Sequence, residues 1–585
     1  MFRIAHRIAP LLSSFLIGTA TIAGGVAGVT LAGATLTGCA DENDPATWVK
    51  RLDDPATRVQ AVTRLVQFYE DKMTKDKGDR NGPEVKPLLA TIIEPMTQRC
   101  VAGEMDERTT SKLVKFLSDT RDPKAEPCFI KVLKEYKPDS TEDDLRSVSR
   151  AVGAMKLKSA AGPLMEAFTK LRASKPKAQS TYRDVYDAMV SLSDPSWETQ
   201  LITLLGHAID EKDKNAFTDE MFWQQTAAVV LGNLKSANAV KPLIKLLLAP
   251  AKASAHIDAI LALVKIGKPA IGPTVSLLKG EEKDLVDFSK GEALKAAAAS
   301  GDKNAEKAAS TAYVATAALI LATIGRDEAA ASLIEVLGKT DDNVAKAIMA
   351  RELTKLPRSP QVLQAFETTV EKLPIALSIP NSRGGAREIL LDKAADFYDA
   401  SIVPWVLKTL KEMKGSEEDL APIREAAFGG MMKVMKQDQI KLVEEVAAMK
   451  SGDGTVGKGF AKEFTAAKEL VNNCGDKVEC YLKKVGEPVT DATQFAAIKA
   501  AYMVGVLGDA GAAKKVVDMF PKMSHPAVRF ASITAVDSLL PKGDAAISGQ
   551  LQKMIDDAVE KKDQEKIKLN SPVKTVVYRL NARAQ

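Results

Sequence analysis

The sequence has few of the side chains that most catalytic and metal sites need. Its 585 residues include four histidines, five cysteines and four tryptophans. Beyond residue 40 the histidines are His207, His256 and His525, which are isolated from one another and from cysteine. A zinc site needs such ligands in a cluster, and no Gly-x-Ser-x-Gly elbow of a serine hydrolase occurs. These absences predict a protein that is not an enzyme, with no metal and no diffusible cofactor.

A large excess of one charge sign is also missing. The formal net charge is +5, and an N-terminal segment without acids contributes Arg3 and Arg7, which leaves +3 for the rest. Proteins that bind nucleic acid usually carry a marked excess of basic residues. We therefore expect no nucleic-acid partner.

The N-terminus has the layout of a secretory signal. Two basic residues precede a stretch from Ile8 to Leu36 that carries no charge, and Thr37, Gly38 and Cys39 follow. A basic start, an apolar centre and small residues before the cut define such a signal, which predicts a signal peptide over 1–38. A transmembrane helix is the alternative, because about 20 apolar residues span a bilayer, but the many glycines and threonines argue against it.

The four residues at 36–39 resemble the lipobox of bacterial lipoproteins. This resemblance implies cleavage between Gly38 and Cys39 and a covalent lipid on the Cys39 thiol, with 39–44 as a short acidic spacer. It also implies a lipid-anchored protein of a Gram-negative envelope. In enteric bacteria an Asp after the lipidated Cys retains the protein on the inner membrane, and here Ala40 holds that place. We expect the outer membrane, with the chain facing the periplasm or the surface.

Four cysteines remain once Cys39 is assigned to lipid. Disulfides are the usual fate of cysteines in an oxidising compartment. Cys474 and Cys480 flank a short turn and are expected to pair. For Cys100 and Cys128 the pairing stays open, because a regular up-and-down register separates them by more than the ~7 Å that a bridge allows between Cα atoms. A helix break at Pro95 would change that register.

From residue 45 to 585 one pattern recurs every ~35–45 residues, namely two amphipathic helices joined by polar turns. The clearest example has apolar residues at Val240, Leu243, Ile244 and Leu247, the spacing of a half-buried helix. A second helix follows from 256 to 266 and ends at a glycine, which is typical of a helix stop.

These segments resemble HEAT repeats and the shorter HEAT-like repeats of phycobilisome lyases. The matching residues are Ala-Val-Lys-Pro-Leu-Ile-Lys-Leu-Leu at 239–247, and His/Asp-Pro followed by Arg and Ala at 525–531 and 54–61. The resemblance implies an all-α, right-handed α-solenoid of about 13 antiparallel helix pairs. The pattern lapses near 279–309, where we expect an inserted polar loop or an extra exposed helix.

A basic residue recurs early in the predicted second helices. In HEAT proteins such residues commonly pair with acids of neighbouring repeats, so the resemblance implies a repeat ladder. The alternative is a basic stripe that binds a ligand. The members of the series are Arg58, Arg146, Arg183, Lys346, Arg387, Arg424 and Arg529.

A solenoid presents an extended concave surface, because small rotations between repeats accumulate. We expect a non-enzymatic scaffold that binds other envelope proteins through its second helices and binds the membrane through its lipid. C-terminal repeats would then project away from the membrane. An envelope-organising or structural role is the alternative, and a lyase-like HEAT enzyme is less favoured because the chain is exported.

Overall fold

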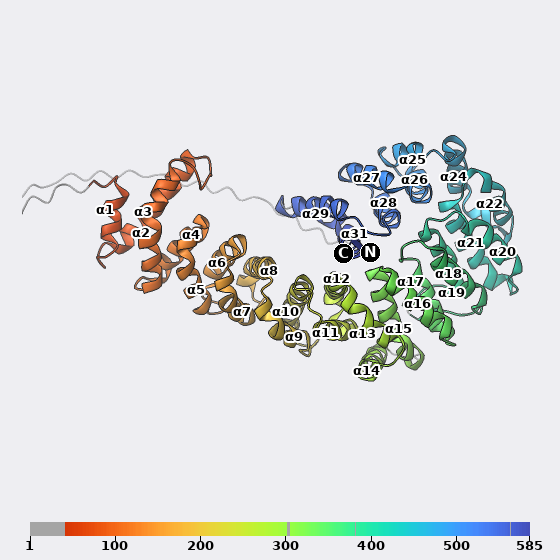
Figure 1. Ribbon diagram of the computed structural model, residues 1–585, viewed down its shortest axis with the longest axis horizontal. Helices are drawn as coiled ribbons and strands as arrows, with labels where there is room; N and C mark the ends of the chain where they lie inside the picture. Colours follow the sequence, from red (N-terminus) through yellow and green to blue (C-terminus); the bar gives the residue numbers. More distant parts are fainter. Residues whose placement is uncertain (1–40, 301–304, 381, 562, 585) are drawn as a thin grey trace, which may run out of the picture.

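Antiparallel helix pairs follow one another along nearly all of the described chain, which forms an all-α solenoid (Figure 1). The computed structural model describes residues 41–300, 305–380, 382–561 and 563–584. The predicted signal peptide and Cys39 lie outside these residues.

The N-terminal half forms an extended arm (Figure 1). Its helices are α1 (Pro45–Arg51), α2 (Arg58–Lys75), α3 (Val85–Ala102), α4 (Glu107–Thr120), α5 (Glu126–Lys134), α6 (Glu142–Met155), α7 (Ala161–Lys170), α8 (Thr181–Leu192), α9 (Glu198–Leu205), α10 (Lys214–Asn233) and α11 (Val240–Leu247).

The C-terminal half curls round on itself (Figure 1). Its helices are α12 (His256–Ile266), α13 (Lys268–Leu278), α14 (Lys283–Ser300), α15 (Ala305–Ile324), α16 (Asp327–Lys339), α17 (Asn343–Leu353), α18 (Pro360–Lys372), α19 (Ala386–Lys393), α20 (Ile402–Glu412), α21 (Glu417–Val434), α22 (Ile440–Ala447), α23 (Val456–Gly459), α24 (Ala461–Cys474), α25 (Val478–Val485), α26 (Gln494–Leu507), α27 (Ala510–Met519), α28 (Pro526–Leu539), α29 (Ala545–Glu560), α30 (Gln564–Leu569) and α31 (Ser571–Ala584).

Short elements join several of these helices. A two-stranded hairpin, β1 (Lys450–Ser451) and β2 (Gly454–Thr455), follows α22. The 3-10 turns are η1 (Pro123–Ala125), η2 (Lys158–Ala160), η3 (Pro176–Gln179), η4 (Pro195–Trp197), η5 (Pro250–Ala255), η6 (Ala394–Phe397), η7 (Gln437–Gln439) and η8 (Phe520–Lys522).

The helices begin and end where local chemistry favours it. The Asp44 carboxylate accepts a hydrogen bond from the Ala46 amide at 3.0 Å and caps α1, and Asp106 caps α4 in the same way. An acidic cap satisfies amides that have no partner within the helix and complements its dipole. Gly267, with a φ of +73°, separates α12 from α13. A left-handed turn there is favourable only without a side chain.

Glycines let the second helices of successive repeats touch backbone to backbone. A Cβ atom added to Gly153 of α6 would lie 2.9 Å from the Cα of Ala188 in α8. One added to Gly232 of α10 would lie 2.7 Å from the Cα of Ala262 in α12. One added to Gly430 of α21 meets the α19 backbone at the same distance. Close contact within this row bends the solenoid toward its second helices, because the first helices keep full-sized side chains between them.

Two disulfides lie within the described residues. Cys474 and Cys480 join α24 to α25, with Cα atoms 5.4 Å apart. Cys100 and Cys128 join α3 to α5, with Cα atoms 5.6 Å apart. The question that the sequence left open is settled by helix length rather than by Pro95, which lies inside α3 without ending it. Because α3 has 18 residues and α5 only nine, the start of α5 lies beside the end of α3.

The insertion near 279–309 contains an extra helix. Helix α14 lies between the two helices of one repeat, α13 and α15, and contacts both. None of the described helices is by itself both long and apolar enough to cross a bilayer. Judged by length and composition alone, α11 and residues 250–266 together are long and apolar enough to cross a bilayer. This pair is bent by 117°.

The C-terminal repeats fold back onto the middle of the chain. Helix α31 packs against α12 and α15 as well as against its neighbour α28. Arg326, just before α16, donates from Nη1 to the Ala582 carbonyl at 2.7 Å across 256 positions of sequence. Figure 1 shows the C-terminus in the middle of the molecule, beside α12. We call α12–α31 the ring and α1–α11 the arm.

The same substitution at two glycines should have opposite effects if backbone contact sets the curvature. Gly153→Ala should destabilise the protein by about 1–3 kcal/mol, because the added methyl group overpacks the α6–α8 contact. Gly162→Ala, on first helix α7, meets nothing within 4 Å and should stabilise by up to ~1 kcal/mol through helix propensity. Thermal melting and hydrogen exchange of α6 and α8 measure both, and equal stabilisation by the two variants would contradict the close-contact explanation.

Candidate functional site

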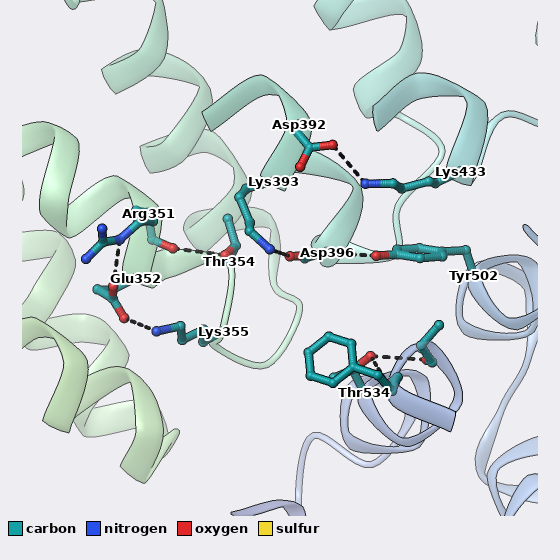
Figure 2. A network of polar contacts seen from close by, with 12 residues as sticks. Arg351, Glu352, Thr354, Lys355, Asp392, Lys393, Asp396, Lys433, Tyr502 and Thr534 are labelled. Carbon is teal, nitrogen blue, oxygen red and sulfur yellow. Dashed lines mark hydrogen bonds and ion pairs between the residues drawn. The ribbon is translucent and has the colours of Figure 1, made fainter. Parts of the chain in front are cut away.

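A network of polar side-chain contacts joins helices inside the ring (Figure 2). Asp392 of α19 pairs with Lys433 of α21 at 2.8 Å. Asp396 of η6 pairs with Lys393 at 3.0 Å and accepts a hydrogen bond from the Tyr502 hydroxyl of α26 at 2.9 Å. The network therefore ties the second helices of different repeats to one another.

Each carboxylate drawn in this network has a cationic partner. Glu352 is 1% exposed and pairs with Arg351 at 3.0 Å and with Lys355 at 2.5 Å. Burial alone would lower the pKa of Lys393, but Asp396 and other nearby acids raise it on balance. Each of these carboxylates is thus held in an ion pair within the protein. The described residues also contain no group of three His, Cys, Asp or Glu placed to hold a metal ion.

Aromatic residues also pack inside the ring. Tyr398 stacks on Tyr502 with centroids 5.1 Å apart, and its hydroxyl contacts Thr534 and the Ala531 carbonyl of α28. Burial raises the pKa of both tyrosines. Helices η6, α26 and α28 thus meet inside the ring. The expectation of a contact face along all second helices is wrong for this half, because these helices bind one another.

Helix α31 is held in place by charge. Asp537 of α28 pairs with Arg579 at 2.9 Å and with Arg583, and Arg579 also donates to the Lys355 carbonyl beyond α17. Burial lowers the pKa of Arg579, while Asp537 raises it. A carboxylate and a carbonyl partner together restrict the orientation of this buried guanidinium, although the Arg579 Nε has no hydrogen-bond partner in the described chain.

The contact of α31 with α12 also contains groups that burial leaves poorly solvated. Burial raises the pKa of Asp258 in α12 to about 6, and Lys574 of α31 lowers it by a smaller amount. Burial lowers the pKa of Lys265 to about 8, and its ammonium lies 4.5 Å from the ring centroid of Tyr578. We therefore expect the α12–α31 contact to depend on pH.

The arm keeps its second helices open. In Figure 1 α4, α6 and α8 lie along the edge that faces the ring, and α5, α7 and α9 lie along the other edge. The exposed or half-buried faces of these second helices carry basic residues from one repeat to the next. We call this series the arm stripe, and its members are Arg64, Lys112, Lys115, Arg150 and Arg183.

Part of the arm stripe lacks carboxylate partners. Arg64 lies over the Phe68 ring at 4.6 Å, and Lys112 contacts the Thr63 hydroxyl at 3.5 Å. Among the described residues, neither Lys115 nor Arg150 has a carboxylate within 4.0 Å. Both are exposed, so an anionic partner can approach them. The sequence prediction missed Lys112, Lys115 and Arg150. Their spacing along exposed helix faces was the available signal.

The predicted repeat ladder forms at two places, at Arg146 and at Arg58, which pairs with Glu104 of the next repeat. Arg146 of α6 pairs with Asp184 of α8 at 3.2 Å. Arg58, Arg387 and Arg529 are buried and donate to carbonyls at the end of the preceding helix. The last carbonyls of a helix lack partners within it, and a guanidinium supplies several donors at once.

Each of these three arginines therefore fastens the second helix of a repeat to the first. Arg58 donates to Leu52, which caps α1, and Arg387 donates to Leu373, which caps α18. Arg58 also pairs with Glu104 at 2.9 Å. Arg529 donates to Met523 after η8 and to the Asn570 side chain, and burial lowers its pKa to about 10.

The remaining members of the series do not extend the ladder. Arg424 pairs with Glu417 of its own helix and donates to the Lys450 carbonyl. For Arg183 and Lys346 no carboxylate lies within 4.0 Å in the described part of the chain. Inter-repeat ion pairing thus holds for Arg58 and Arg146, whereas the other partners in the series are backbone carbonyls, an amide side chain or a residue of the same helix.

Comparisons with known proteins show weak likeness to other long helical proteins. No family model matches the chain, and no curated protein matches it. The structure of karyopherin Kap121p bound to the extreme C-terminus of the phosphatase Cdc14p is 12% identical, with a TM-score of 0.31 over 90% of this chain and 69% of the other. A structure of importin beta is 10% identical, with a TM-score of 0.27 over 92% and 74%.

A third structure comes from work on a phosphorylation switch that controls the interaction between cadherin and beta-catenin. It is 12% identical, with a TM-score of 0.27 over 92% of this chain and 99% of the other. Scores this low carry no argument about function, and the fold assignment rests on the chain's own helices.

Replacing Asp258 should stabilise the α12–α31 contact at neutral pH. A carboxyl whose folded pKa lies above its unfolded value favours folding below pH ~4, and this advantage is lost as pH rises through about 6. Asp258→Asn should therefore increase the protection of α31 amides against hydrogen exchange at pH 7.5, by at most ~3 kcal/mol. At pH ~3.5, below both pKa values, the variant and the original protein should nearly coincide.

The exposed Asp119 of α4 offers a matched control. Asp119→Asn should leave exchange in α31 unchanged at both pH values. A loss of α31 protection in Asp258→Asn at pH 7.5 would show that the carboxylate holds the contact together.

Proposed function

We propose that this chain is a non-enzymatic scaffold that binds a protein partner along the second helices of its arm. The observation that carries this proposal is the difference between the two halves. In the ring the second helices are occupied by one another, whereas in the arm they present an open face with basic side chains that lack carboxylate partners. An open solenoid face of this kind suits a protein or peptide ligand.

The charge of the arm stripe favours an acidic segment of the partner. Lys115 and Arg150 lie on neighbouring second helices, α4 and α6, so one extended segment can contact both. Electrostatic complementarity of this kind sets orientation and speeds encounter, and added salt weakens it between exposed charges.

The proposal also includes the bacterial envelope as the location and a covalent lipid on Cys39 as the anchor. Residues 36–39 support it through their lipobox pattern. The disulfides support an oxidising compartment, and Cys39 is the fifth cysteine, left over from those two pairs. Because α1 begins at Pro45, the anchor would hold the arm close to the membrane, with the outer membrane favoured, and the partners would be other envelope proteins.

Reversing the charge of the arm stripe should abolish partner capture. We expect Lys115→Glu/Arg150→Glu to lose, by at least tenfold, the envelope proteins that the unaltered chain retains in a pull-down followed by mass spectrometry. Capture by the unaltered chain should fall as salt is raised from 50 to 500 mM, because the charges are exposed.

The control is a double variant that reverses the same number of charges on the first helices. Lys86 of α3 and Lys170 of α7 are exposed and lie outside the stripe, so Lys86→Glu/Lys170→Glu should retain the same proteins. If both double variants behaved alike, the arm stripe would not be the binding face.

Cys39→Ala should prevent lipid attachment. Radiolabelled palmitate should label the unaltered protein but not the variant, which should stay uncleaved or leave the membrane fraction. Cys100→Ala, which breaks the Cys100–Cys128 disulfide without touching the lipobox, should keep the label. An unlabelled original protein, or unchanged cleavage and membrane partition in Cys39→Ala, would refute the anchor.

A further inference from the structure

The extra helix α14 creates a cavity on the side of the solenoid away from the arm stripe. It packs near α11 and η5, and these elements together with α9 enclose a cavity of about 630 Å³. Small-molecule sites typically measure ~300–1,000 Å³. The insertion thus adds a site of small-molecule size to an otherwise regular array of helix pairs.

One part of this cavity is apolar. Its apolar wall is formed by side chains of α9, the loop after it, α11 and α14, namely Ile202, Leu205, Ile209, Leu246, Leu285 and Phe288. Leu285 is 3% exposed and Leu246 is 1% exposed, so this wall belongs to a packed core and keeps its shape. It can take the apolar body of a ligand.

The other part of the cavity is basic. Lys252 of η5 donates to the Leu205 and His207 carbonyls, both at 2.8 Å, and among the described residues no carboxylate lies within 4.0 Å of its ammonium. Burial lowers the pKa of Lys252, although Glu220 raises it by a smaller amount. Lys245 of α11 lies 4.8 Å from the ring centroid of Phe288 and likewise has no carboxylate within that distance in the described chain.

The other charges at the cavity are accounted for. Lys241 pairs with Glu282 at 2.8 Å, and Lys295 pairs with Glu292 at 2.7 Å. Glu211 and Asp284 lie at the cavity and are exposed, so water screens them. The two lysines beside the apolar wall are therefore the charges without an ion-pair partner in the described chain, and Lys252, which Glu220 and Glu292 influence only from a distance, is partly removed from water.

We propose that this cavity binds a small amphiphile with one anionic head group and an apolar tail, of the fatty-acid class. The head group pairs with Lys252 and Lys245, and the tail lies against Leu246, Leu285 and Phe288. An anion within reach of Lys252 compensates a charge that burial otherwise disfavours. The tail gains the burial of apolar surface.

The test uses residues 40–585, which include every described helix, and the fluorescent acid 11-(dansylamino)undecanoic acid. We expect saturable one-to-one binding, with a fluorescence increase as the probe leaves water, and displacement by dodecanoate. The methyl ester of the probe should bind about tenfold more weakly, because it has no charge for Lys252 and Lys245 to pair with.

Variants separate the head-group site from the tail site. Lys252→Met should weaken binding of the acid probe about tenfold and leave binding of the ester unchanged. Lys245→Met repeats this test without removing the hydrogen bonds to the Leu205 and His207 carbonyls. Ala208→Trp, which places a large side chain at the cavity, should weaken both probes. Lys170→Met on α7 should change neither. Circular dichroism and melting temperature establish that each variant is folded.

Three outcomes would overturn the proposal. They are the absence of saturable binding to the folded chain, equal affinity for the acid and the ester, and undiminished binding to Ala208→Trp. Displacement of the probe by a soluble acidic peptide but not by dodecanoate would also overturn it, because the cavity would then be a peptide site.

Discussion

Backbone contact between neighbouring second helices is the constraint on which the rest of this structure depends. Gly153 and Gly232 face alanines of the next second helix at distances that allow no further atom. A row of helices packed this tightly on one side must curve toward that side. Gly153 lies in the extended arm, and the chain curls beyond α12 until α31 meets that helix. Small residues at helix crossings therefore set how closely neighbouring second helices pack.

Closure divides the chain into two halves with different electrostatics. Inside the ring, charges pair with one another across repeats, as Asp392 does with Lys433 and Asp537 does with Arg579. Along the arm, Lys115 and Arg150 remain exposed. Buried ion pairs contribute little net stability but impose one geometry, so the network of the ring fixes a unique closure. The exposed charges of the arm are free to contact a partner.

The sequence predicted the local structure and missed the long-range structure. The stripe at Val240, Leu243, Ile244 and Leu247 and the helix that follows it are present, and α12 ends at Gly267 as expected. Ring closure was not predictable, because it is the sum of many small rotations that no single repeat encodes. The partners of Arg58 and Arg387 were missed because they are backbone carbonyls, and these leave no mark in a residue pattern.

The closed ring also has a consequence for how the chain is made. Arg326 and Ala582 meet across 256 positions, and α31 is only 14 residues long. The arm can assemble repeat by repeat as the polypeptide emerges, whereas the ring must wait for its last residues. Until then α12 and α15 lack their partner, so a truncated product displays apolar surface that a finished one conceals.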